Sequence, residues 1–288
     1  GEANSDEGFP MTRPQYACAF GQMIEGWRKA WNSPSLPFGF VQLSSWTGNW
    51  GFDQMPCVAN YCPVISRIRL AQADVVGQAG PPSASERGAP IPGAPSFPLS
   101  NTFMAVAYDQ GDNQQHGVHS RFKSEPARRL ALQLIHTAFG SSTPFSGPLP
   151  LSAHHATSTA SGVSSKSTAG AISVRVVVSH SSMLRLNDTH TCNEQFEKKC
   201  CAAGASGFGA RICTAAVPAD CAITADGKTV FDANVTIDSP TSILVTASAT
   251  AESSSSASFV EFGVTDFPQC SVVNELGIAM GPFILPVE

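Results

Sequence analysis

The sequence predicts a mixed α/β part over residues 1–147, followed by a β-rich, β-sandwich-like domain over residues 148–288. Two observations predict this division. In the first part, two short apolar runs that suit buried parallel strands alternate with stretches of helical period. In the second part, β-type runs are separated by turn residues, and no long helical period appears. A length of 288 residues fits one large domain or two ordinary ones.

The helices of the first part are predicted from apolar spacing. Residues three to four apart favour a helix over 16–31, whose apolar positions are Phe20, Met23, Ile24, Trp27 and Trp31. A second helix is expected over 66–76 and a third over 124–138. Ser124 is expected to cap the third helix, because serine at this position accepts a hydrogen bond from the first turn.

Two apolar runs, at 38–43 and 102–107, predict buried parallel strands between these helices. The proline- and glycine-rich residues 80–98 predict a long surface loop that feeds the second strand. Residues 148–170 are expected to form a polar junction. Beyond that junction, strands are expected at 172–178, 229–237, 241–247 and 258–264.

Composition excludes several classes of function. The net charge is −5 and the lysines and arginines are scattered, so no basic surface for nucleic acid is expected. No apolar run approaches 18 residues, so no membrane span is expected. Nine cysteines and two glycosylation sequons, at Asn187 and Asn234, predict a secreted or lysosomal glycoprotein with disulfides. The odd cysteine predicts a free thiol, or a disulfide partner outside this chain.

Several short blocks carry the chemistry. Gly1-Glu2-Ala3-Asn4 opens the chain, and His119-Ser120-Arg121-Phe122-Lys123 precedes the third helix. Between them lie segments 20–28, 37–44, 69–72 and 101–109, and Arg128-Arg129-Leu130 follows. Together, in this order, the blocks resemble the sialate O-acetylesterase family, a group of SGNH-type serine esterases. The detailed resemblance covers about the first 150 residues and continues more weakly to the Gly281-Pro282-Phe283 tail.

The resemblance implies an SGNH-hydrolase-like three-layer parallel sheet. It implies the removal of acetyl groups from sialic-acid hydroxyls by a serine mechanism, without metal or cofactor. The family's serine block lies upstream of the Gly-Glu-Ala-Asn segment. We therefore expect this chain to be the C-terminal portion of such an enzyme, without its first strands, and an N-terminal segment or subunit to supply the serine.

Site roles carry over by position. His119 becomes the general base and Asn4 an oxyanion donor. The group that orients the base is less closely specified, because Gly117 stands where many SGNH enzymes carry Asp. Either Glu2 or a backbone carbonyl then orients His119. The chain also reads His119-Ser120 where the family often reads His-Pro.

Four other residues match the family's blocks. Arg69 and Gln72 are candidate substrate-binding residues, with Arg69 suited to a sialate carboxylate, although packing or a structural ion pair explains the pair equally well. Asp109 and Asp112 are expected to shape the loop that carries His119 by hydrogen bonding within it.

The expected partners are acetylated sialoglycans or free acetylated sialic acid. Two alternatives stay open: an esterase for other acetylated sugars such as xylan, and a non-catalytic paralogue that binds acetylated glycans. The 80–98 loop is expected to border the site and affect specificity. Other constellations are rejected: Ser152, His154 and His155 are assigned to the polar junction, and His116 with His119 lacks the further ligands that a metal needs.

Overall fold

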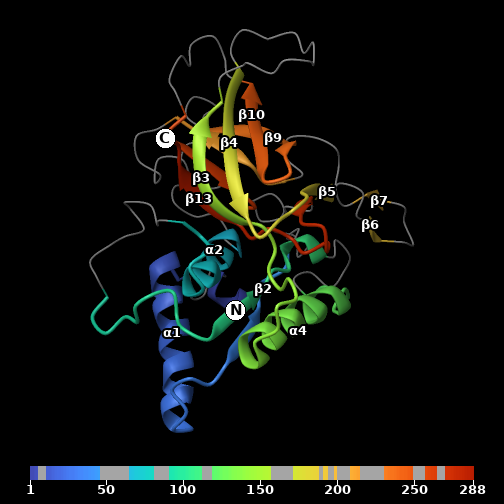
Figure 1. Cartoon of the computed structure of the whole chain (residues 1–288). Coiled ribbons are helices and arrows are strands. Elements are labelled where there is room, and N and C mark those ends of the chain that lie inside the picture. Colours follow the sequence, from blue (N-terminus) through green and yellow to red (C-terminus); the bar gives the residue numbers. More distant parts are fainter. Residues whose placement is uncertain are drawn as a thin grey trace.

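The computed structural model describes residues 1–5, 11–45, 65–80, 91–111, 119–156, 171–187, 191–193, 198–199, 208–214, 230–248, 257–264 and 270–288. Within these ranges the fold is a mixed α/β one. Figure 1 shows helices gathered around short strands in the lower half, and antiparallel strands in the upper half. None of the described helices is long and apolar enough to span a membrane.

All three expected helices are present, with shifted ends. They are α1 (Arg13–Ala30), α2 (Ile65–Val75) and α4 (Ser124–Phe139). Helix α1 begins three residues earlier than expected, because Thr12 and Gln15 form a reciprocal capping box. The expected cap of α4 is wrong. Lys123 occupies the cap position without a side-chain bond, and Ser124 is the first helical residue.

The parallel pair consists of β1 (Phe38–Val41) and β2 (Thr102–Ala105), and Phe38 faces Thr102 in the register. Helices cover both faces of this pair. On one face Phe20 of α1 packs edge-on against Phe40, with ring centroids 4.8 Å apart. On the other face, a methyl group built on Gly39 would lie 3.1 Å from Leu130 of α4. The expectation that the first strand is buried holds only in part, because Val41 is exposed.

An ion pair joins α1 to α2 across 61 positions of the sequence. Arg13 at the start of α1 holds both carboxylate oxygens of Asp74 in α2, at 2.6 and 2.7 Å. The same guanidinium donates to the Gly80 carbonyl at 2.9 Å. Residues 91–98 of the expected surface loop pack on α1, where Gln22 donates to the Gly93 carbonyl at 3.0 Å. Residues 81–90 of that loop lie outside the described residues.

The second half of the chain forms a seven-stranded antiparallel sheet in the order β13-β11-β8-β9-β10-β4-β3. Its strands are β3 (Leu149–His155), β4 (Ala171–Ser179), β8 (Arg211–Cys213), β9 (Val230–Ser239), β10 (Ser242–Ser248), β11 (Phe259–Phe262) and β13 (Phe283–Pro286). Two small antiparallel pairs accompany it: β5 (Arg185–Asn187) with β12 (Ser271–Val273), and β6 (Thr191–Asn193) with β7 (Lys198–Lys199).

The β-sandwich-like domain was expected over residues 148–288, and its main strands form one continuous sheet, because β9 runs through both halves of that sheet. Residues 230–232 of β9 pair with β8, and residues 233–239 pair with β10. The two outer strands also meet, since Ala153 of β3 forms a parallel bridge with Val287, just after β13. The polar junction expected from residue 148 is wrong in its first part, where residues 149–155 form β3.

The α/β region and the strands share buried contacts. Ile284 of β13 donates its backbone N–H to the Ala79 carbonyl at 3.0 Å. The Tyr108 ring, just after β2, packs edge-on against Phe262 of β11 at 6.5 Å. One hydrophobic cluster includes residues from both regions. A division into domains at residue 147 therefore stays a prediction.

Candidate active site

The carboxyl ends of β1 and β2 are held together by side chains from the loops that follow them. The Ser45 hydroxyl, after β1, donates to the carbonyl of Tyr108, after β2. Backbone pairing also continues past β1, because Gln42 donates its N–H to the Ala105 carbonyl at 2.9 Å. This edge of a parallel sheet is where α/β proteins place ligands and reacting groups.

The N-terminal block lies beside the end of β1. A methyl group built on Gly1 would lie 3.0 Å from the Leu43 side chain. Residues Glu2–Ser5 form a 3-10 helix, η1, in contact with α2. The Asn4 backbone is fixed at both groups: its N–H donates to Gly1 at 3.1 Å, and its carbonyl accepts from Met11 at 3.0 Å. Within the described residues the Asn4 side chain forms no hydrogen bond, so its amide can donate to a ligand.

Arg69 and Gln72 support the segment that follows β1. Both side chains are buried, and Arg69 is 0% exposed. The Arg69 guanidinium donates to the Ser44 carbonyl at 3.4 Å, and the side-chain amide oxygen (Oε1) of Gln72 accepts from the Leu43 N–H at 2.9 Å. These contacts give both residues a structural role. Their use as substrate ligands stays a prediction.

His119 is exposed and lies immediately before a buried anchor, Ser120. The Ser120 hydroxyl donates to the Gln110 carbonyl and accepts the N–H of Phe122 at 3.1 Å. Gln110 belongs to a short 3-10 helix, η2 (Tyr108–Gln110), that begins three residues after the last residue of β2. The His119 ring is thus open to a ligand, while the backbone next to it is held.

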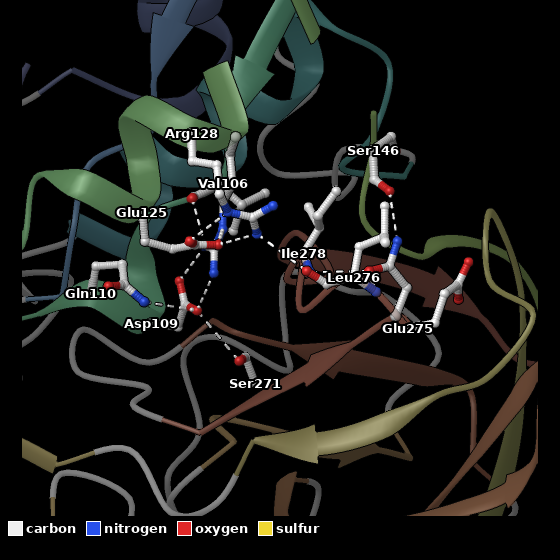
Figure 2. Close-up of polar contacts among 12 residues, drawn as sticks. Val106, Asp109, Gln110, Glu125, Arg128, Ser146, Ser271, Glu275, Leu276 and Ile278 are labelled. Atoms are coloured by element: carbon white, nitrogen blue, oxygen red, sulfur yellow. Dashed lines mark hydrogen bonds and ion pairs between the residues drawn. The ribbon is translucent and has the colours of Figure 1, made fainter. Parts of the chain in front are cut away.

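A buried ion-pair cluster joins η2 to α4 (Figure 2). Arg129 binds both Asp109 oxygens, at 2.6 and 2.7 Å, and also donates to the Val106 carbonyl at 2.8 Å. Glu125, one turn earlier, accepts from Arg129 at 2.9 Å and from Arg128 at 2.7 Å. The Asp109 and Arg129 side chains are 0% and 2% exposed.

This cluster affects the titration of its members. Burial acts to raise the pKa of Glu125, but the hydrogen bonds and charges of Arg128 and Arg129 outweigh it, so the pKa is lowered. Burial raises the pKa of the neighbouring Tyr108 phenol well above its usual range, with the Asp109 charge adding to the effect. Tyr108 is therefore a neutral, packed side chain at the carboxyl edge.

The cluster also contacts the segment between β12 and β13. Ser271 of β12 donates to Asp109 at 3.5 Å, and Arg128 donates to the Leu276 carbonyl at 3.2 Å. Nearby, the fully buried Asn274 donates to the Ser146 carbonyl at 3.0 Å. Figure 2 shows Ser271 below Asp109 and Leu276 to the right of the cluster, so residues of the β-rich half reach the ion pairs that join η2 to α4.

The comparisons with known proteins can be set beside this geometry. No family model matches the chain. Mouse sialate O-acetylesterase is 33% identical over 164 residues, which cover 52% of this chain and 24% of the mouse protein. The rat protein of the same name is 32% identical over an equal length and equal shares. The chain resembles the sialate O-acetylesterases.

The sialate O-acetylesterase resemblance thus spans about a quarter of the length of those relatives. A crystal structure of a carbohydrate acetylesterase from Xanthomonas citri matches with a TM-score of 0.60 at 19% identity. That match covers 99% of this chain and 48% of the other. At this identity the match shows the fold alone, which is a fold that a hydrolase uses.

The residues that the sialate O-acetylesterase resemblance singles out are only partly brought together. Asn4 lies near the end of β1 and His119 follows β2, but no hydrogen bond or ion pair between described residues joins His119 to Asn4 or Glu2. The Glu2 charge instead acts on Tyr16 of α1, whose pKa is raised chiefly by burial. Asp112, His116 and Gly117 lie outside the described residues.

Sequence reasoning missed two features of this site. Arg129 belongs to the Arg128-Arg129-Leu130 block, yet its pairing with Asp109 was not expected. An Asp after a strand and an Arg on the next helix are a pattern that could have indicated it. Asp109 does accept a local hydrogen bond from the Gln110 side chain at 3.2 Å, but it also forms the ion pair that was not expected. The Ser120 bond to Gln110 was also missed, because its acceptor is a backbone carbonyl.

The rejected constellations can be located too. Ser152 and His154 face one another on β3, with 2.8 Å between the hydroxyl and Nε2, and His155 is exposed beside them. All three lie on a strand and not in the expected junction. Within the described ranges no group of His, Cys, Asp and Glu could hold a metal ion. Cys213 and Cys270 are buried and disulfide-bonded, whereas the buried Cys18 is a free thiol.

Proposed function

We propose that the protein is a carbohydrate O-acetylesterase that removes acetyl esters from sialic acids by a Ser-His mechanism. The observation that carries the proposal is that each of the two blocks lies beside the end of a strand of the same parallel pair. The Gly1–Asn4 block lies against Leu43 after β1, and His119 follows η2 after β2. The exposed His119 ring is accessible to a substrate, and the Asn4 side-chain amide can donate hydrogen bonds to one.

In this proposal His119 is the general base and Asn4 donates to the oxyanion. The nucleophilic serine lies outside this chain, in an N-terminal segment or subunit. An SGNH-like three-layer sheet is supported by the parallel pair, which has α1 on one face and α4 on the other. Strands of the serine-bearing segment would extend that pair. Either Glu2 or a backbone carbonyl orients the His119 ring.

The substrate and the compartment are part of the proposal. The names of the mouse and rat relatives support an acetylated sialic acid, free or on a sialoglycan, as the substrate. Two buried, disulfide-bonded cysteines, Cys213 and Cys270, support an oxidising compartment. We therefore place the protein in the secretory route or the lysosome.

The test measures acetate release by this chain joined to its serine-bearing segment, with 9-O-acetyl sialic acid and acetylated xylan oligosaccharides as substrates. Substituting a general base lowers kcat by about 100–10,000-fold, so His119→Ala should do so on the preferred sugar. His155→Ala is the matched control, because His155 is an exposed histidine on β3. Asn4→Ala should lower kcat by about 100–1,000-fold.

The outcomes separate the alternatives. Turnover of the sialate ester that His119→Ala removes and His155→Ala leaves intact supports the proposal. Faster turnover of xylan oligosaccharides would instead assign the other sugar class. Binding of acetylated glycans without acetate release would identify a non-catalytic glycan-binding protein. Full activity in His119→Ala would refute the assigned base.

A further inference from the structure

We infer that Ser120 is a positioning residue for His119 and acts through the bond from its hydroxyl to the Gln110 carbonyl. The inference rests on the proposed function, in which His119 is the base. Ser120 is 3% exposed, whereas the adjacent His119 is exposed. The Ser120 oxygen is used twice, because it also accepts the Phe122 N–H at 3.1 Å.

This bond ties the backbone next to His119 to η2. Gln110 and Ser120 are ten positions apart in the sequence, and His119 is the residue before Ser120. Fixing the residue beside His119 removes part of the backbone freedom that would otherwise move its ring. A catalytic group gains from such fixing, because a displacement of about 1 Å can cost about 100-fold in rate.

The backbone at Gln110 is itself held to α4. Asp109, the residue before Gln110, is held by Arg129 through two bonds at 2.6 and 2.7 Å. On the other side, the chain runs from Ser120 into the first turn of α4 at Ser124. Gln110 and Ser120 are therefore both attached to α4, and the Ser120 hydroxyl links them to each other.

The opposite explanation is that Ser120 only satisfies a buried carbonyl and so contributes to stability. Ser146 provides a matched control for that explanation. It is 6% exposed, and its hydroxyl donates to the Gly147 carbonyl at 2.8 Å. Ser146→Ala therefore removes another buried serine bond, to the carbonyl of the adjacent residue, at a site that does not anchor His119.

The experiment compares Ser120→Ala, Ser120→Thr and Ser146→Ala in the complete enzyme, with kcat, KM and urea stability measured for each. Ser120→Ala should lower kcat by about 10–100-fold while KM changes by less than about twofold. Ser120→Thr keeps the hydroxyl and should recover most of kcat. Ser146→Ala should lose stability to a similar extent and keep kcat.

The inference is overturned if Ser120→Ala keeps its kcat, or if kcat in Ser120→Ala and Ser146→Ala falls in proportion to stability. Should Ser120→Ala fail to fold, Ser120→Cys provides the same comparison with a weaker donor of similar size. His119→Ala separates the two proposals. If that variant stays active, the proposed function fails; if it is inactive while Ser120→Ala is fully active, only the positioning role fails.

Discussion

Breaking the Asp109–Arg129 pair from its two sides should give unequal losses of stability. The two partners differ in what each retains. Without Arg129, the Asp109 carboxylate loses both guanidinium bonds, and the contacts that remain to it include the longer bonds from Gln110 at 3.2 Å and from Ser271 at 3.5 Å. Without the Asp109 charge, Arg129 still binds Glu125 at 2.9 Å and the Val106 carbonyl at 2.8 Å.

The magnitudes follow from this difference. Arg129→Met leaves a fully buried carboxylate without its guanidinium, and removing one partner of a buried ion pair costs about 3–5 kcal/mol. Asp109→Asn keeps an oxygen that can accept from Arg129, so its cost is that of weakened hydrogen bonds, about 1–3 kcal/mol. The double variant Asp109→Leu with Arg129→Met removes both charges and should be less damaging than Arg129→Met alone.

Urea unfolding at pH 7, analysed with a common slope, measures the free energy of unfolding of each variant. The expected order of loss is Arg129→Met above Asp109→Asn, with the double variant below Arg129→Met. A loss under about 1 kcal/mol for Arg129→Met would show that the pair is not buried as described. With Asp109→Leu measured alone as well, a double variant whose loss equals the sum of the Asp109→Leu and Arg129→Met losses would refute the coupling between the partners.

Three further predictions concern other parts of the chain. Gly147→Ala puts a methyl group 2.0 Å from the Ala279 carbonyl oxygen and should lower the free energy of unfolding by about 1–3 kcal/mol, whereas Gly26→Ala, with open space around it, should raise it slightly. Asn234 is exposed on β9 within a sequon, so the protein from a secretory host should lose mass on deglycosylation, and Asn234→Gln should remove that change. The pKa of Glu125 is lowered in the folded protein, so its carboxylate stabilises the fold at pH values above the ordinary glutamate pKa of about 4.3. That stabilisation is lost as the pH falls through the folded pKa. In Glu125→Gln the free energy of unfolding should therefore change less with pH below about pH 5.

Much of the fold can be predicted from local pattern. Helix α1 was expected because its apolar residues recur every three to four positions, and β1 and β2 because short apolar runs stand between helices. The pattern fails where the sequence is mixed. Strand β3 contains Pro150 and two histidines, so its composition suggests a junction, yet pairing with β4 over residues 174–179 makes it a strand. Tertiary pairing thus outweighs local propensity there.

The site is predicted less completely because its contacts are long-range. The order of the family-like segments indicated Asn4 and His119 as site residues, but it did not indicate the contacts that fix the backbone around them. The Asp109–Arg129 pair spans 20 positions and the Ser45–Tyr108 bond spans 63, distances at which no local period links the partners. Arg69 and Gln72 show the converse. Their residue types suit a ligand, but their burial and carbonyl contacts indicate support of the segment after β1.

A buried ion pair beside the carboxyl edge needs a reason other than stability. Two apolar side chains of similar size would hold α4 and η2 together about as well. They would not fix an orientation, whereas the planar guanidinium of Arg129 meets both oxygens of Asp109 and sets distance and angle together. Because η2 leads directly to the carbonyl that Ser120 binds, that orientation is passed to the backbone beside His119. In the proposed function His119 is the base and needs a defined direction, so there such a pair has an advantage over an apolar contact.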